Sequence, residues 1–474
     1  MSAAPHVRLL NRDFVLLWQG QLLSQVGSQA FVIALLYWTM EATGSASVMA
    51  ALVIVSTLPA VLLGPFTGVL ADRFSRMRII VLGDVARGVI MLGVAFAAGR
   101  GEPEVVIATL FAGSLVGGVI GAVFNPAIGA AVPDLVPPAG LTRANSIMQL
   151  SGQAAVVLGQ AAAGVLYRVL GAPLLFLIDG VSFVVSGASE AFIRLPHRPA
   201  VGAAPDRVVR SYVRDAREGF SFIRGNVGLR TLVLTATLLN FVFTPVFVLL
   251  PFFVRDVLHA DAAWYGFLLG ALSAGSIAGT AAAGFVAPGG EGRARVVSGA
   301  FLLLPVLLLA LAVSRTAPAT LVILFAAGAL SGLINVVVIT LVQVTSPPEM
   351  RGRVLSIVLA LAQAAMPAGL AIGGVAADVA AVGVPPILAA FGIAGVLAVT
   401  AALRSAPLHT LLALEPSRAP VFTPPAARPR RPPCGPASRR RGAGRARRPG
   451  CPPCAWAGWW PEWPPSRPGA PPRT

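Results

Sequence analysis

The chain has 474 residues, of which 56% are hydrophobic and only 12% are charged, and its mean hydropathy is +0.79. This composition excludes a water-soluble globular protein, because too few polar residues remain to cover a surface in water. The formal charge of +17 is the excess of 36 basic residues, all arginine, over 19 acidic residues. It indicates an anionic lipid bilayer as partner rather than nucleic acid, since basic residues gather on cytoplasmic loops.

Twelve apolar runs follow one another along the chain, each long enough to cross about 30 Å of hydrocarbon at about 1.5 Å per residue. They lie at 14–38, 48–71, 79–98, 105–127, 147–170, 173–193, 232–254, 262–287, 296–313, 319–342, 354–375 and 384–403. The sequence therefore predicts an all-α integral membrane protein with twelve transmembrane helices.

Arginine alternates between the loops on the two sides of these runs, and arginine excess marks the cytoplasmic side. One side receives Arg8, Arg12, Arg73, Arg76, Arg78, Arg143, Arg293, Arg295, Arg351, Arg353, Arg404 and the long 194–230 connection. We therefore expect a multi-pass protein of the plasma membrane with both termini in the cytoplasm.

The long connection divides the chain into six helices plus six. A shift of 210 residues places Pro137-Pro138 on Pro347-Pro348 and Arg143 on Arg353, within the same predicted loop of each half, which indicates two homologous bundles. The predicted division is an N-terminal six-helix bundle at 1–193, a cytoplasmic linker at 194–231 and a C-terminal six-helix bundle at 232–405. The 206–230 part of the linker forms either an amphipathic helix on the inner membrane face or a plain solvated connection.

Residues 406–474 change abruptly to proline, arginine, glycine and tryptophan, and this composition predicts a disordered tail. All three cysteines, Cys434, Cys451 and Cys454, lie in that tail, so no disulfide or metal framework holds the apolar body together. We expect no metal and no cofactor.

One motif stands between the second and third runs: Gly68-Val69-Leu70-Ala71-Asp72-Arg73-Phe74-Ser75-Arg76-Met77-Arg78. It resembles the Gly-x-x-x-Asp-Arg-x-Gly-Arg-Arg signature of the major facilitator superfamily, with Ser75 at the usual small Gly or Asp position. The resemblance implies two six-helix bundles of the major facilitator fold. It also implies a conformational latch, in which the motif approaches the start of the eleventh helix. The latch residues would be Asp72, Arg73, Arg76, Arg351 and Arg353.

Further stretches between residues 8 and 405 are similar to the branch of that superfamily that contains the enterobactin exporter and macrolide-efflux proteins. They include Asn11-Arg12-Asp13-Phe14, Asn125-Pro126-Ala127 and Thr345-Ser346-Pro347-Pro348-Glu349-Met350-Arg351-Gly352-Arg353. The branch implies a secondary active transporter: a proton-coupled exporter of a drug, siderophore-like compound or metabolite, working by alternating access. The sparse charge in the predicted spans favours a small neutral or amphipathic cargo, since a strongly charged one would need a buried countercharge. Drug–proton antiporters of the superfamily carry Gly-Pro-x-x-x-Gly in helix five, where this chain has Gly159-Gln160-Ala161-Ala162-Ala163-Gly164.

Polar residues inside apolar helices are costly unless they face protein or water. The first run carries a polar stripe at helical spacing, which predicts one wall of a central cavity, with interhelical hydrogen bonding as the alternative. The cavity-lining candidates are Gln21, Ser24, Gln25, Ser28, Gln29, Gln160, Asn240, Asn335 and Gln363.

Ionisable residues within the runs are few. Asp84 and Arg87 lie three residues apart and form either an ion pair or part of a proton-coupling system. Asp179 has no charged neighbour in the sequence, so it is the stronger proton-carrier candidate, with a hydrogen-bonded structural role as the alternative. Glu190 and Asp378 lie near helix ends.

The sequence carries no enzyme signature, since it lacks a phosphate-binding Gly-x-x-x-x-Gly-Lys loop and its four histidines are scattered. We expect a monomer that binds a small-molecule substrate and protons. Two alternatives stay open: a facilitator or importer of a metabolite or lipid, and a non-transporting membrane receptor on the same fold.

Overall fold

The computed structural model describes residues 11–73, 75–194, 205–286, 290–379 and 383–414. Side chains are described throughout these ranges except at 64–73, 205–212 and 285–286. Most of the predicted tail, 415–474, lies outside the described residues.

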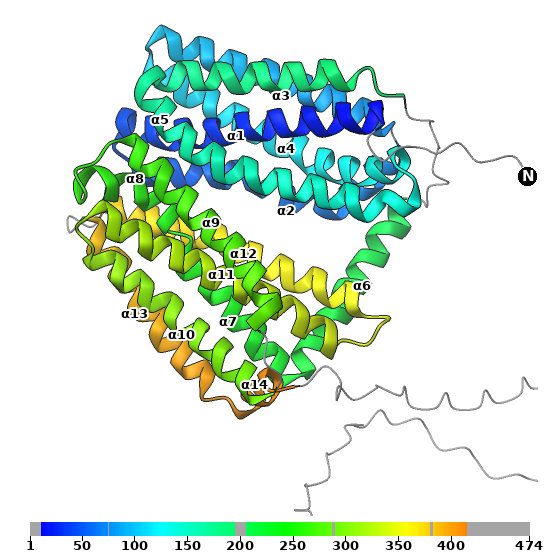
Figure 1. The fold of residues 1–474 in the computed structure, drawn as a ribbon, viewed down its shortest axis with the longest axis vertical. Coiled ribbons are helices and arrows are strands. Elements are labelled where there is room, and N and C mark those ends of the chain that lie inside the picture. Colours follow the sequence, from blue (N-terminus) through cyan, green and yellow to red (C-terminus); the bar gives the residue numbers. More distant parts are fainter. Residues whose placement is uncertain (1–10, 74, 195–204, 287–289, 380–382, 415–474) are drawn as a thin grey trace, which may run out of the picture. The chain divides into compact units, whose positions relative to one another are not determined.

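The described chain consists of helices joined by short connections (Figure 1). In chain order they are α1 (Arg12–Thr43), α2 (Ala46–Arg73), α3 (Arg76–Arg100), α4 (Pro103–Leu135), the 3₁₀ turn η1 (Pro138–Gly140), α5 (Leu141–Glu190), α6 (Pro205–Gly225), α7 (Val227–Phe243), α8 (Val246–Asp256), α9 (Ala262–Val286), α10 (Glu291–Val313), α11 (Ala317–Thr345), α12 (Arg351–Val379), α13 (Val384–Leu403) and α14 (Ala406–Leu412).

Eleven segments of the described chain are long and apolar enough to cross a membrane, and one of them, Pro138–Glu190, has 53 residues. At about 1.5 Å per residue it is more than twice the thickness of a bilayer core. Its helix α5 is interrupted at Gly171, where φ is 74° and ψ is 173°, a conformation that only glycine adopts readily. Pro173 follows this break, so α5 supplies two crossings, and the prediction of twelve transmembrane helices is confirmed.

The helices pack mainly with partners from their own half of the sequence. In the first half, α1–α5, α1 and α3 pack on α5, and α2 packs on α4. In the second half, α7–α14, α9 packs on α11, α10 on α13 and α12 on α7. Figure 1 shows the same grouping, with blue-to-cyan helices together and green-to-orange helices together.

Small residues allow α9 and α11 to approach backbone to backbone, the usual solution where lipid supplies no hydrophobic force between helices. A Cβ atom at Gly328 of α11 would lie 2.9 Å from the carbonyl carbon of Leu272 and 3.0 Å from the amide nitrogen of Ser276, both in α9. Gly275 of α9 approaches Phe325 and Ala329 of α11 in the same way.

We therefore expect Gly328→Ala to destabilise the protein by about 1–3 kcal/mol, because the added methyl group forces two backbones apart. Thermal unfolding in detergent measures the effect as a lower midpoint. Gly284→Ala is the matched control in α9, since a Cβ there meets no atom within 4 Å and alanine is the better helix former. Equal midpoints for the two variants would contradict close packing at Gly328.

The predicted segment boundaries need two adjustments. The seventh crossing begins at Val227, inside the predicted linker, and the linker itself contains the helix α6. The predicted disordered tail is wrong for its first nine residues. There α14 buries Leu408, Leu411 and Leu412, and Arg293 of α10 donates hydrogen bonds to the carbonyl oxygens of Leu412 and Leu414. These residues are ordered because their apolar side chains are buried and their carbonyl groups bind the buried guanidinium group, although the sequence that follows them is polar.

Candidate functional site

Three cavities that share lining residues with one another lie within the described helices. The largest, the central cavity, has a volume of about 680 Å³ and is lined by both halves: Ser28, Ser56, Arg87 and Asp179 belong to the first, and Gln363 of α12 to the second. Cavities of about 300–1,000 Å³ hold drug-sized molecules. The central cavity therefore has the dimensions of a small-molecule site.

The first-half cavity, of about 230 Å³, shares Ser28, Arg87 and Asn125 with the central cavity. The predicted polar stripe of α1 forms one wall of it through Gln21, Ser24, Gln25 and Ser28. These side chains recur at three- and four-residue spacing and so occupy one face of the helix.

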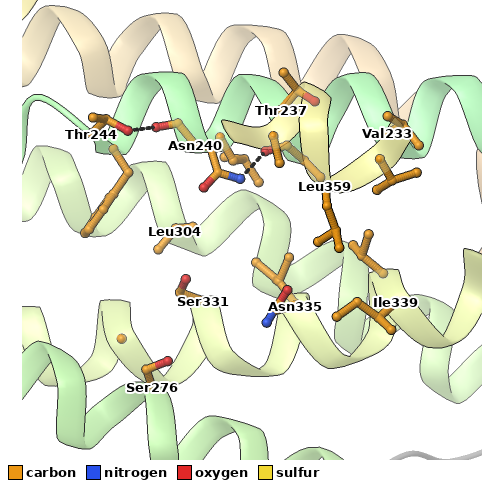
Figure 2. A pocket seen from close by; sticks show the side chains of 18 of the residues that line it. Val233, Thr237, Asn240, Thr244, Ser276, Leu304, Ser331, Asn335, Ile339 and Leu359 are labelled. Carbon is orange, nitrogen blue, oxygen red and sulfur yellow. Dashed lines mark hydrogen bonds between the residues drawn. The ribbon is translucent and has the colours of Figure 1, made fainter. Parts of the chain in front are cut away.

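The second-half cavity, of about 440 Å³, shares Leu359 with the central cavity. Figure 2 shows Asn240 of α7 and Asn335 of α11 on facing helices, among side chains that include Val233, Leu304 and Ile339. The Asn240 amide donates to the carbonyl oxygen of Ala236 at 3.0 Å, which holds it along its own helix. This chamber is largely apolar, with a few amide and hydroxyl groups.

Two of the nine cavity-lining candidates are not among the lining residues of these three cavities. Gln160 accepts a hydrogen bond from the Ser273 hydroxyl at 2.9 Å and so joins α5 to α9. A Cβ atom built at Gly159 of α5 would lie 2.9 Å from the Cβ atom of Gln29. The Gln29 side chain therefore packs between α1 and α5. The remaining seven line one of these cavities: four residues of the polar stripe of α1, and the single amides of α7, α11 and α12.

Arg87 and Asp179 are the charged side chains among the described residues that line the central cavity. The Arg87 guanidinium carbon lies 4.4 Å from the ring centroid of Phe124 and 5.6 Å from that of Phe183, so aromatic faces, rather than Asp84, contact this cation. Asp179 is 1% exposed, and its Oδ1 has no hydrogen-bond partner among the described residues. The Ser28 hydroxyl lies within hydrogen-bonding reach of the Asp179 carboxyl group.

The two halves meet at the helix ends opposite the arginine-rich loops. Asp378, near the end of α12, accepts hydrogen bonds from the Ser45 hydroxyl at 2.6 Å, the Ala46 amide at 2.8 Å and the Ser47 amide at 3.1 Å. It thus caps the N-terminus of α2, where unpaired amides and the helix dipole favour an anion. We call this contact the Asp378 cap.

Other contacts between the halves lie at the same end. Arg168 of α5 forms an ion pair with Asp261 at 2.6 Å, and the rings of Tyr37 and Tyr265 lie 6.0 Å apart. A Cβ at Gly164 of α5 would lie 2.8 Å from the Cα of Gly266 in α9, so these helices touch through their backbones. The described contacts therefore close the space between the halves at this end.

At the arginine-rich end, the predicted latch residues have other partners. Arg76 pairs with Asp134 at 2.5 Å, and Arg351 donates to the carbonyl oxygen of Ser346 at 3.3 Å. Arg353 pairs with Asp215 at 3.0 Å and with Glu218, both on α6. The side chains of Asp72 and Arg73 lie outside the described residues.

Three features of the site are not predictable from sequence spacing. Phe183 covers Arg87, Asp378 caps α2, and Glu190 accepts a hydrogen bond from Gln21 at 2.9 Å. Each involves residues more than 90 positions apart, so no local spacing reveals the pairing. A charge placed near a helix end in an apolar chain was the one available signal.

The site can be compared with known proteins. The Major Facilitator Superfamily profile matches residues 17–361. Macrolide efflux protein A of Streptococcus pyogenes is 31% identical over 247 residues, which cover 51% of this chain and 59% of that protein, so the match spans less than two thirds of the relative. Multidrug efflux pump Tap of Mycolicibacterium fortuitum is 25% identical over 366 residues, 75% of this chain and 86% of Tap.

Solved structures share the fold at low identity. A bacterial homologue of the iron transporter ferroportin, in an inward-facing state, has a TM-score of 0.65 and 19% identity and covers 85% of this chain and 100% of its own. The nucleoside transporter NupG has a TM-score of 0.68 and 10% identity over 83% of this chain and 99% of its own. At identities this low, the similarity shows the fold and does not indicate the transported molecule.

Proposed function

The chain belongs to the Major Facilitator Superfamily, and on that premise we propose that it is a proton-coupled exporter of small neutral or amphipathic molecules. The family consists of transporters and not enzymes, and a multi-pass transporter of this fold takes a small-molecule substrate within the membrane. The observation that carries the proposal is the central cavity, because side chains of both halves line it and relative movement of the halves would open it to either side.

The chemistry of the cavities supports a cargo with a polar end and an apolar body. Arg87 and Asp179 carry opposite charges on the same cavity, so the described lining residues do not favour a strongly charged cargo of either sign. The second-half cavity offers leucine, isoleucine and valine surface with two amides. An amphipathic molecule matches both chambers.

Direction is supported by the relatives, whose names are those of efflux proteins. We propose that the arginine-rich end faces the cytoplasm of a bacterial cell, with both termini on that side, and that the contacts at the opposite end close the outside in this conformation. The halves that move would correspond to 1–193 and 232–405, joined by 194–231, and the protein would act as a monomer.

The cytoplasmic latch remains part of this proposal. In the conformation described, the guanidinium groups of Arg76 and Arg353 are held by Asp134 and by the α6 carboxylates. Charged hydrogen bonds of this kind must be exchanged before the same arginines can meet Asp72. The linker helix α6 would then take part in switching, because it competes for Arg353.

We expect bacteria that express the chain to accumulate less erythromycin and less ethidium than cells with an empty vector, and a protonophore to abolish the difference. Uptake of both probes, measured with and without the protonophore, tests the proposal. Higher accumulation in expressing cells would indicate an importer. Equal accumulation in expressing and empty-vector cells, unchanged by the protonophore, would contradict proton-driven export of these probes.

A further inference from the structure

A second group of acidic side chains lies inside the first half, away from the central cavity. Asp84 of α3, Ser186 of α5 and Glu190 of α5 are each 0% exposed, and Gln21 of α1 is 4% exposed. The Ser186 hydroxyl donates to Asp84 Oδ2 at 2.7 Å, and the Gln21 amide donates to Glu190 Oε1 at 2.9 Å. Three helices thus hold two carboxyl groups in one buried place.

The remaining oxygen of each carboxyl group has no donor among the side chains that the structure describes. Asp84 Oδ1 and Glu190 Oε2 are buried and lack a hydrogen-bond partner among the described residues, although the two carboxyl groups lie within hydrogen-bonding reach of each other. Two ionised carboxylates can only accept, so neither can satisfy the other. A single proton on the pair changes this, because one carboxyl then donates and its neighbour accepts.

Among the described residues, no cation forms an ion pair with Asp84 or Glu190. On α3, Arg87 interacts electrostatically with Asp84 through space, but its guanidinium group lies over Phe124 and Phe183 rather than on Asp84. On α5, Asp179 faces the central cavity, and from α1 the contact is the neutral Gln21. Two adjacent negative charges without a paired cation are strongly unfavourable in an interior of low dielectric constant.

The backbone is shaped around the pair. A Cβ at Gly20 of α1 would lie 3.0 Å from Glu190 Oε1 and 2.9 Å from the Ser186 hydroxyl oxygen, so any larger residue would displace these groups. Gln21 next to it also lines the first-half cavity. Gln21 therefore contacts the buried pair through Glu190 and also lines a cavity that shares Ser28 and Arg87 with the central cavity.

We propose that Asp84 and Glu190 form a proton-binding site that holds one proton in this conformation and exchanges it with the first-half cavity past Gln21. As a coupling site it rests on the proposed export function, whereas its proton occupancy does not. Because α1, α3 and α5 all contribute, movement among these helices changes how stably the proton is held. Asp84 and Glu190 titrate as a unit, so the proton belongs to the pair.

Infrared spectroscopy of the purified full chain in lipid nanodiscs tests the occupancy directly. At neutral pH, the wild-type spectrum minus that of the Asp84→Asn/Glu190→Gln double variant should contain one protonated carboxyl C=O band and one ionised carboxylate band. Asp179→Asn is the matched control and should retain both bands. Glu190→Gln alone, which keeps the carbonyl acceptor for Gln21, serves if the double variant does not fold, and it should remove the shared-proton signature.

Two ionised carboxylate bands and no protonated band would refute the proton-binding site, as would bands that respond to sodium in place of protons.

Transport measurements then test coupling. In proteoliposomes, Glu190→Gln should lower erythromycin movement driven by a pH gradient about tenfold, within the 5- to 150-fold range of coupling between sites. Exchange without a gradient should stay intact, and Glu102→Gln, an exposed carboxyl, should behave as wild type. Absent wild-type transport would refute the export proposal while leaving the infrared result valid. Gradient-driven transport equal in wild type and Glu190→Gln would refute coupling by the pair.

Discussion

Asp179→Asn is expected to lower transport driven by a proton gradient about tenfold or more while cargo still binds. Asp179 lies on the central cavity, is 1% exposed and has an Oδ1 without a partner among the described residues, so a proton bound there is shielded yet next to the cargo space. Asparagine keeps the shape and most hydrogen bonding but cannot titrate. Proteoliposomes loaded with erythromycin provide the measurement, with gradient-driven efflux compared against exchange without a gradient.

Asp256→Asn provides the matched control for this substitution. Asp256 is exposed and pairs with the neighbouring Arg255 at 2.6 Å, and exposed pairs contribute little. Its transport should equal wild type. If Asp179→Asn keeps its full dependence on the proton gradient, Asp179 has a structural role only.

Asp378→Ala is expected to shift the protein toward the state that is open at the end of the Asp378 cap. The substitution removes the acceptor for one hydroxyl and two amides at the start of α2. Loss of an N-terminal cap costs about 0.5–2 kcal/mol, and about 1.4 kcal/mol is a tenfold change in an equilibrium. Because Asp378 is exposed, we expect the lower to middle part of that range, a shift of about 3- to 10-fold.

Cysteine labelling measures this shift. All three native cysteines lie in the tail, so they can be replaced, and Ser56→Cys then places one reporter on the central cavity. An impermeant maleimide added from outside should label it faster in Asp378→Ala than with Asp378 intact. Asp261→Asn breaks the exposed pair with Arg168 at the same end and should have a small effect. Unchanged labelling in Asp378→Ala would refute the cap.

Local patterns in the sequence were sufficient to predict most of the fold. Apolar length located the crossings, and the interval between 170 and 173 anticipated the interruption of α5 at Gly171. The turn of α14 was missed, because its three buried leucines stand at the edge of a polar tail and their value depends on Arg293, more than 110 residues away. Composition describes a segment by itself, whereas burial depends on what covers it.

The residues that line the cavities were predictable from the sequence, but the side chains that contact one another were not. The stripe on α1 has helical spacing, which is visible in the sequence, and it lies on the first-half cavity. The spacing of Asp84 and Arg87 suggested a mutual ion pair, but the structure turns Arg87 to two phenylalanine rings and Asp84 to Ser186. Which of several nearby partners a charge takes is decided by helices that come together from distant parts of the chain.

The arrangement of the three cavities has a consequence for inhibition of transport. The second-half cavity is lined by helices of one half and the first-half cavity by helices of the other, and the central cavity between them shares Leu359 with the one and Arg87 with the other. A ligand confined to one chamber can travel with its half, but a dumbbell-shaped molecule with a group seated in each chamber would tie the two halves together. Such a bivalent compound would block the relative movement of the two halves. The length of its spacer would determine its potency more than the chemistry of either end group.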